Sequence, residues 1–216
     1  MEKKTDFKAL SNKAKVQYIW DYYRLHIIVG VAAILIIGSV IHHFVTYREP
    51  LLNVIMINTS SGEATSSDGF NEFLDAYGYD RKDNPVSVFG SLQFVDSGIN
   101  LTETYANYEV LSTMIAAGEE DLFFGTGDVF LDYAKQGAFI DLRNILSDET
   151  LSKYEGSILY STDDGETEEY PCAIELTDNE WLKENGYYSD GNCYFGVIYH
   201  TEIPDATAQF AKFLLE

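Results

Sequence analysis

The sequence predicts an α/β protein in which one transmembrane helix precedes a single domain with a mainly parallel sheet. The apolar run from Leu25 to Val45 contains no Asp, Glu, Lys or Arg. At about 21 residues it is long enough to cross a bilayer as a helix. After this run, short apolar segments alternate with segments of helical periodicity, and that alternation favours parallel strands joined by right-handed crossovers.

Aromatic residues mark both ends of the apolar run. Trp20, Tyr22 and Tyr23 precede it and Tyr47 follows it, and such side chains prefer the bilayer interface. A cleavable signal peptide is the alternative, because a basic segment also precedes the run. The run ends in 42–45, His-His-Phe-Val, without a small-residue cleavage site, so an uncleaved anchor over 25–45 is favoured.

Charge divides the chain at the predicted anchor. Residues 1–24 form a basic amphipathic segment with six basic and three acidic residues, a net charge of +3, whereas the whole chain carries −21, which leaves −24 for the remainder. Basic flanks stay in the cytoplasm, so we expect 1–24 inside and the domain of 46–216 outside, at the cell membrane. So acidic a domain is not expected to bind nucleic acid.

The domain's predicted elements follow in order. Apolar runs predict central strands at 51–57, 86–94 and 121–124. Apolar residues at helical spacing predict helices at 68–77, 105–117, 128–137 and 204–216, with Gly78 and Gly118 ending the first two. Asp190-Gly191 stands between aromatic runs and predicts a hairpin turn.

Two cysteines, Cys172 and Cys193, lie in the domain predicted to be outside, where a disulfide can persist. A bridge would close a loop of about 22 residues and contribute roughly 3 kcal/mol. Two buried thiols are the alternative, and spacing alone does not decide between them.

Four stretches resemble segments of the extracellular solute-binding proteins of ABC importers, the first two of them in the first lobe. They are Gly118 with 121–123 (Asp-Leu-Phe), Ala134 with 137–142 (Gly-Ala-Phe-Ile-Asp-Leu), 169–171 (Glu-Tyr-Pro) and the PDATAQFAKFLLE stretch of 204–216. The resemblance implies a single periplasmic-binding-protein-like lobe and, as partners, a small solute or an ABC permease. Only about thirty residues separate Pro171 from Pro204, too few for a second lobe, so solute capture between two lobes is not expected.

The sequence points to binding rather than catalysis. The domain holds a single histidine beyond the anchor, His200, and offers no catalytic, metal-ligating or cofactor-binding constellation. In open parallel sheets ligands bind beyond the carboxyl ends of the strands. Here those ends predict a ligand or partner face, with plain polar turns as the alternative: Asn58, Thr59, Ser60, Asp96, Gly125, Thr126 and Asp128. We expect a membrane-anchored module for protein interaction or, alternatively, a small-solute (sugar or peptide) receptor.

Overall fold

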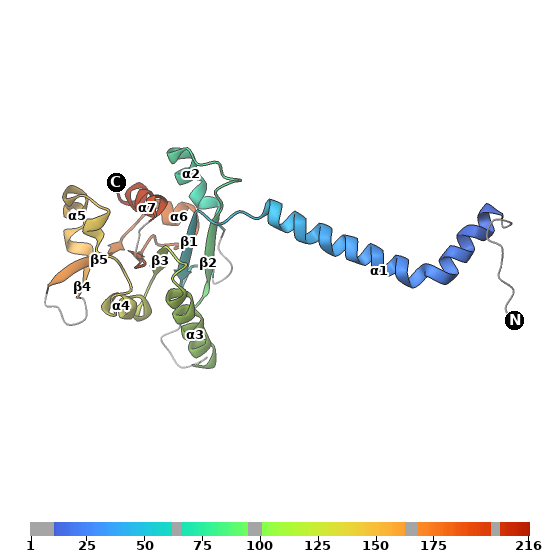
Figure 1. Ribbon diagram of the computed structural model, residues 1–216. Helices are drawn as coiled ribbons and strands as arrows, with labels where there is room; N and C mark the ends of the chain where they lie inside the picture. The colour runs from blue at the N-terminus through green and yellow to red at the C-terminus, as the bar shows by residue number, and fades with distance from the viewer. Residues whose placement is uncertain (1–10, 62–65, 95–100, 163–167, 200–203) are drawn as a thin grey trace. The chain divides into compact units, whose positions relative to one another are not determined.

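The computed structural model describes residues 11–61, 66–94, 101–162, 168–199 and 204–216 (Figure 1). Its contacts divide the chain into two compact units, Met1–Tyr47 and Arg48–Glu216. Among the described residues, the first unit contains one long helix, and the second contains the sheet and the other helices.

The first unit is built around α1, Asn12–Thr46, a continuous helix of 35 residues. Ser11 caps it by accepting a hydrogen bond from the Ala14 amide at 3.4 Å. The described part of the basic segment and the apolar run are therefore one helix, whereas residues 1–10 lie outside the described residues. The stretch Trp20–Thr46 has 27 residues and a mean hydropathy of 2.4, and none of its most apolar part is buried against protein. Within the described chain, this helix alone is long and apolar enough to cross a membrane.

The second unit contains a six-stranded mixed sheet with the order β2-β1-β3-β6-β5-β4 (Figure 1). Strand β1 pairs in parallel with β2 and β3, whereas β6, β5 and β4 join through antiparallel pairs. The predicted parallel half is therefore present, but the sheet as a whole is not mainly parallel. The strands are β1 Leu52–Ile57, β2 Val86–Leu92, β3 Leu122–Gly125, β4 Ile158–Thr162, β5 Glu169–Leu176 and β6 Cys193–Val197.

One predicted central strand lies at the edge of the sheet. Strand β2 pairs only with β1, and its Ser87 and Ser91 side chains are exposed. Its predecessor Pro85 lacks an N–H group, which suits the start of an edge strand. The prediction of 86–94 as a central strand was therefore wrong, whereas β1 and β3 are central, as predicted.

Four helices of the second unit, α2, α3, α4 and α7, overlap the predicted segments, whereas α5 and α6 were not predicted. Two predicted helices end at glycines in the left-handed conformation, Gly78 with φ 76° and Gly118 with φ 68°. This conformation favours glycine because it has no Cβ. The helices are α2 Asn71–Tyr77, α3 Leu101–Ala117, α4 Asp128–Lys135, α5 Asp148–Lys153, α6 Glu180–Glu184 and α7 Asp205–Leu215, with 3-10 turns at Asp68–Phe70, Leu142–Asn144 and Glu155–Ser157.

Helices cover both faces of the sheet and form two hydrophobic cores. The larger core packs residues of α2, α5, α6 and α7 against one face, and its rings include Phe70 and Phe210, 5.0 Å apart. The smaller core packs α3 and α4 against the other face, where Phe130 stacks on Phe139 at 4.9 Å. The domain is therefore a three-layer α/β/α structure.

The predicted hairpin at Asp190-Gly191 is wrong. Strands β5 and β6 are antiparallel neighbours, but residues 177–192, which include α6, connect them. Gly191, with φ 70°, forms a turn that leads into β6. The aromatic residues before it, Tyr187 and Tyr188, are buried in the connection and do not belong to a strand.

The buried carboxylate of Asp121, just before β3, joins three other parts of the domain. Its Oδ2 accepts the amide of Asn53 in β1 at 2.8 Å, and its Oδ1 accepts the hydroxyl of Thr207 in α7 at 3.3 Å. Its backbone N–H donates to the Asn53 carbonyl, and its carbonyl accepts the amide of Ile198, which follows β6. Strands β1, β3, β6 and helix α7 therefore meet at one acidic residue.

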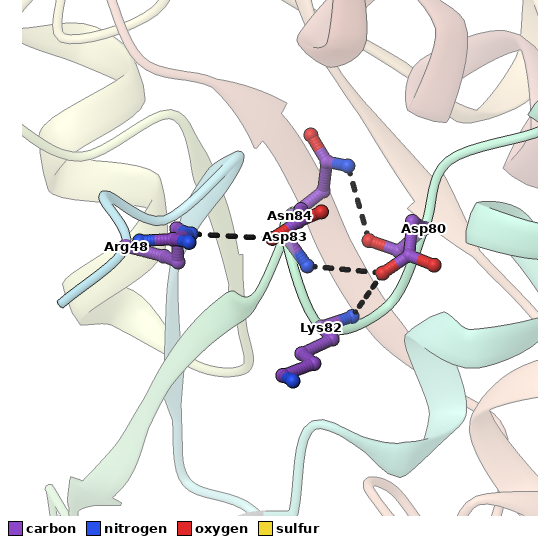
Figure 2. Close-up of polar contacts among 5 residues, drawn as sticks. All are labelled: Arg48, Asp80, Lys82, Asp83 and Asn84. Carbon is purple, nitrogen blue, oxygen red and sulfur yellow. Dashed lines mark hydrogen bonds and ion pairs between the residues drawn. The ribbon is translucent and has the colours of Figure 1, made fainter. Parts of the chain in front are cut away.

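A turn at the amino edge of the sheet, where β1 and β2 begin, contacts the first residue of the domain (Figure 2). Asp80 Oδ1 accepts the amides of Lys82 and Asp83 at 2.9 and 3.2 Å, and the Asn84 side chain donates to the Asp80 carbonyl. Arg48 Nε lies 3.2 Å from Asp83 Oδ1. Both side chains of this ion pair are exposed, so we expect it to contribute less than about 1 kcal/mol.

We expect the substitution Asp121→Ala to lower the free energy of unfolding by about 2–5 kcal/mol, because the Asn53 amide and the Thr207 hydroxyl lose their acceptor in a buried place. Urea unfolding of the full chain in detergent micelles, followed by near-UV circular dichroism, measures this loss. The matched control is Asp128→Ala, an exposed acid in the first turn of α4, which should cost less than about 1 kcal/mol. Equal losses for the two variants would contradict the role assigned to Asp121.

Candidate functional site

The carboxyl edge of the sheet, where β1, β2 and β3 end, contains most of the predicted ligand or partner face. Asn58 follows β1 in a left-handed conformation, with φ 55°. Its Nδ2 donates to the Thr126 carbonyl at 3.0 Å, and its Oδ1 accepts the amide of Phe94 at 2.6 Å. The side-chain amide of Asn58 thus connects the ends of three neighbouring strands, and both its nitrogen and its oxygen already make hydrogen bonds within the domain.

Thr59 and Ser60 are also engaged in contacts within the domain. The buried Thr59 hydroxyl donates to the Gly90 carbonyl at 3.1 Å. Ser60 donates its amide to the Tyr187 carbonyl at 2.9 Å, and its Oγ accepts the amide of Ser189 at 2.7 Å. Residues 187–189 therefore lie across the end of β1. This segment belongs to the short stretch between Pro171 and Pro204, and no pattern in the sequence indicates where it packs.

The residues after β3 form the accessible part of the edge. Gly125 is buried, and a Cβ there would lie 2.5 Å from Ile57 Cγ1, so only glycine fits. Thr126 is half-buried, and Asp128 is exposed as the first residue of α4. The structure thus brings Asn58 and Thr126 together, while the predicted site residue Asp96 lies outside the described residues.

A small pocket of about 230 Å³ opens beside Thr126. Tyr194 of β6 pairs in register with Gly125 of β3 on one side and with Glu175 of β5 on the other. Its ring stacks on Phe130 at 5.4 Å. The pocket is lined by Thr126, Gly127, Glu175, Asn192, Cys193 and Tyr194. We refer to these six residues as the carboxyl-edge pocket.

The carboxyl-edge pocket combines an aromatic ring with acidic and amide groups. Burial raises the pKa of Tyr194, and the nearby carboxylates of Glu175 and Asp128 raise it further. A negative field of this kind disfavours anions and favours cationic or hydroxyl groups. Sequence reasoning missed Glu175, Asn192 and Tyr194, because only the antiparallel placement of β6 brings them to the ends of the parallel strands.

The size of the pocket limits what it can hold. Pockets for drug-sized ligands have volumes of about 300–1,000 Å³, so this one fits a single side chain or a comparably small group. No group of three or more His, Cys, Asp or Glu side chains that could hold a metal ion occurs in the part of the chain that the structure describes.

The two cysteines are separate buried thiols rather than a disulfide. Cys172 belongs to the core under α3 and α4, whereas Cys193 belongs to the core on the other face, and Leu176 is the residue opposite Cys193 in the sheet. Burial raises the pKa of the Cys172 thiol to about 11. Burial also raises the pKa of Cys193 well above its usual range, with a smaller contribution from Asp190.

Comparisons with known proteins give one distant similarity. No family model matches the chain, and no curated protein matches it significantly. A solved structure described as "Extracellular solute-binding protein family 1 from Alicyclobacillus acidocaldarius subsp. acidocaldarius DSM 446" is similar over 66% of this chain, with 17% sequence identity and a TM-score of 0.37. The matched region spans 34% of that protein, about a third of its length. A similarity this distant says nothing about what this chain binds.

We expect both thiols to resist alkylation in the folded protein, because burial leaves very little thiolate at pH 8 and the thiolate is the reactive form. Maleimide labelling of the full chain without reductant, counted by intact mass, should give no adduct in the native state. After unfolding in guanidinium chloride it should give two adducts per chain. An unfolded, unreduced chain that takes up none would show that a disulfide exists after all.

Proposed function

We propose that this protein is a single-pass membrane protein whose acidic domain binds a partner protein outside the cytoplasm. The proposed parts are a cytoplasmic basic segment of 1–24, a membrane-spanning helix of 25–45 and an extracytoplasmic domain of 46–216. The observation that carries the proposal is α1, because its apolar side chains are not covered by protein.

The exposure of α1 supports its role as an anchor. Ile34 is 71% exposed and Phe44 is 77% exposed within the protein, and their apolar neighbours are exposed in the same way. Apolar surface in water costs roughly 25 cal/mol per Å², and a bilayer removes that cost over the whole length of the span. The basic charge before the helix and the acidic charge after it support an orientation with the N-terminal segment inside.

The features of the carboxyl edge favour binding of a partner protein over capture of a small solute. The pocket is smaller than typical ligand pockets, and the Asn58 and Thr59 side chains are already bonded within the domain. The exposed groups that remain are the carboxylates of Asp128 and Glu175. The exposed Asn192 side chain lies beside them, and its Oδ1 accepts the Asp178 amide at 2.8 Å. These groups suit a basic or hydroxyl-bearing side chain of a partner placed in the pocket. The sequence resemblance to solute-binding proteins makes an ABC permease one partner to test.

The proposed topology predicts that a cysteine introduced at Lys13 is shielded from a membrane-impermeant maleimide in intact cells. A cysteine introduced at Asp148, which is exposed in the domain, should react without permeabilisation. Both labelling experiments use a chain with Cys172 and Cys193 replaced by serine, and permeabilised cells give the full extent of labelling. Labelling at position 13 in intact cells, with none at 148, would reverse the topology.

Binding at the carboxyl edge predicts a position-dependent pattern of photo-crosslinking in native membranes. A photoreactive residue at Glu175 or Asn192 should give protein adducts, whereas one at Lys82, in the exposed turn at the amino edge (Figure 2), should not. Mass spectrometry identifies the adducts. Adducts from Lys82 alone, or from none of the three positions, would contradict the proposal. In that case, calorimetric saturation by a sugar or peptide would favour the alternative of a solute receptor.

A further inference from the structure

We infer that the N-terminal turns of α1 form a binding surface for anionic phospholipids, which rests on the proposed anchoring. Lys13, Trp20 and Arg24 recur at spacings of seven and four residues in a continuous helix. Such spacings place side chains on one helical face. Two cations therefore flank one aromatic side chain at the boundary between the basic segment and the apolar span.

An apolar hollow lies on the same face of the helix. It is shallow and open to solvent, and it is lined by Asn12, Lys13, Val16, Gln17 and Trp20. Val16 is 68% exposed and Trp20 is 53% exposed. Exposed tryptophan rings prefer the level of the headgroups, and a cation beside such a ring lies close to the lipid phosphates.

The position of residues 1–24 before the apolar span, and their net charge, indicate that the molecule bound here is an anionic phospholipid. Figure 1 shows that α1 changes direction within its darker blue, N-terminal part. The segment 1–24 carries a net charge of +3, with Asp21 as the acidic residue nearest to Arg24. Anionic headgroups complement Lys13 and Arg24, and an acyl chain fits against Val16 and Trp20, whereas a zwitterionic headgroup supplies no net charge.

Fluorescence of Trp20 tests this surface directly. Trp20 and Trp181 are the two tryptophans of the chain, so the substitution Trp181→Phe leaves Trp20 as the reporter. The full chain is reconstituted in equimolar phosphatidylglycerol and phosphatidylcholine vesicles, in which one lipid or the other carries bromine on its acyl chains. We expect brominated phosphatidylglycerol to quench Trp20 more, with a relative binding constant of roughly fivefold that falls as salt is added.

A charge-matched pair of variants assigns the effect to the surface. Lys13→Gln with Arg24→Gln should bring the ratio close to one. Lys135→Gln with Lys153→Gln removes the same charge from exposed positions of the domain and should leave the ratio unchanged. A ratio of one in the parent chain, or an unchanged ratio in the first variant, would overturn the inference while the anchoring stands.

If α1 does not anchor the protein in the bilayer, the quenching experiment gives a different result. Absence of quenching by either brominated lipid would mean that Trp20 is not at the bilayer, which contradicts the proposed function and this inference together. If Trp181→Phe does not fold, native mass spectrometry of the parent chain gives the answer instead. Phosphatidylglycerol should be retained over phosphatidylcholine after extraction from the mixed vesicles, and equal retention would overturn the inference.

Discussion

The arrangement of the domain depends on one buried carboxylate. Asp121 accepts hydrogen bonds from β1 and α7, and through its own backbone it pairs with β1 and with the residue after β6. A carboxyl group in such a place is tolerated because its oxygens accept hydrogen bonds from the Asn53 amide and the Thr207 hydroxyl. These hydrogen bonds link α7, which supplies Phe210 to the larger core, and the residue after β6 to β1 and β3. This role of Asp121 could not be predicted from the sequence, because its hydrogen-bond partners lie far from it along the chain. Asp121 was noted there only as part of the resemblance to solute-binding proteins.

Helices and their ends can be predicted from neighbouring residues, whereas the pairing of distant strands cannot. The helices α2 and α3 and their glycine ends follow from periodicity and from the conformational freedom of Gly78 and Gly118, which are properties of neighbouring residues. The edge position of β2 and the antiparallel placement of β6 depend on which strands pair. Many pairings satisfy the same local pattern, so the predicted parallel sheet holds for β1, β2 and β3 and fails beyond them.

Part of the candidate site could be predicted from the sequence in the same way, and part could not. The carboxyl ends of β1 and β3 were placed at one edge by a general rule of parallel sheets, and the structure brings Asn58 and Thr126 within hydrogen-bonding distance. The side chains that shape the pocket, Glu175 and Tyr194, come from β5 and β6 and could not be foreseen without the register of those strands. Residues 187–189 also cover part of this edge, the end of β1, which was predicted to be accessible to a ligand or partner.

The position of β6 has a consequence for how the domain folds. This strand pairs with β3 on one side and β5 on the other, so without it the sheet separates into a parallel piece and an antiparallel piece. Residues 193–197 are synthesised after every other strand of the sheet, and pairing over such sequence distances is slow. Under the topology proposed above, the domain would not complete its sheet until β6 had crossed the membrane as well. Until then its apolar strands are exposed to aggregation or to chaperones.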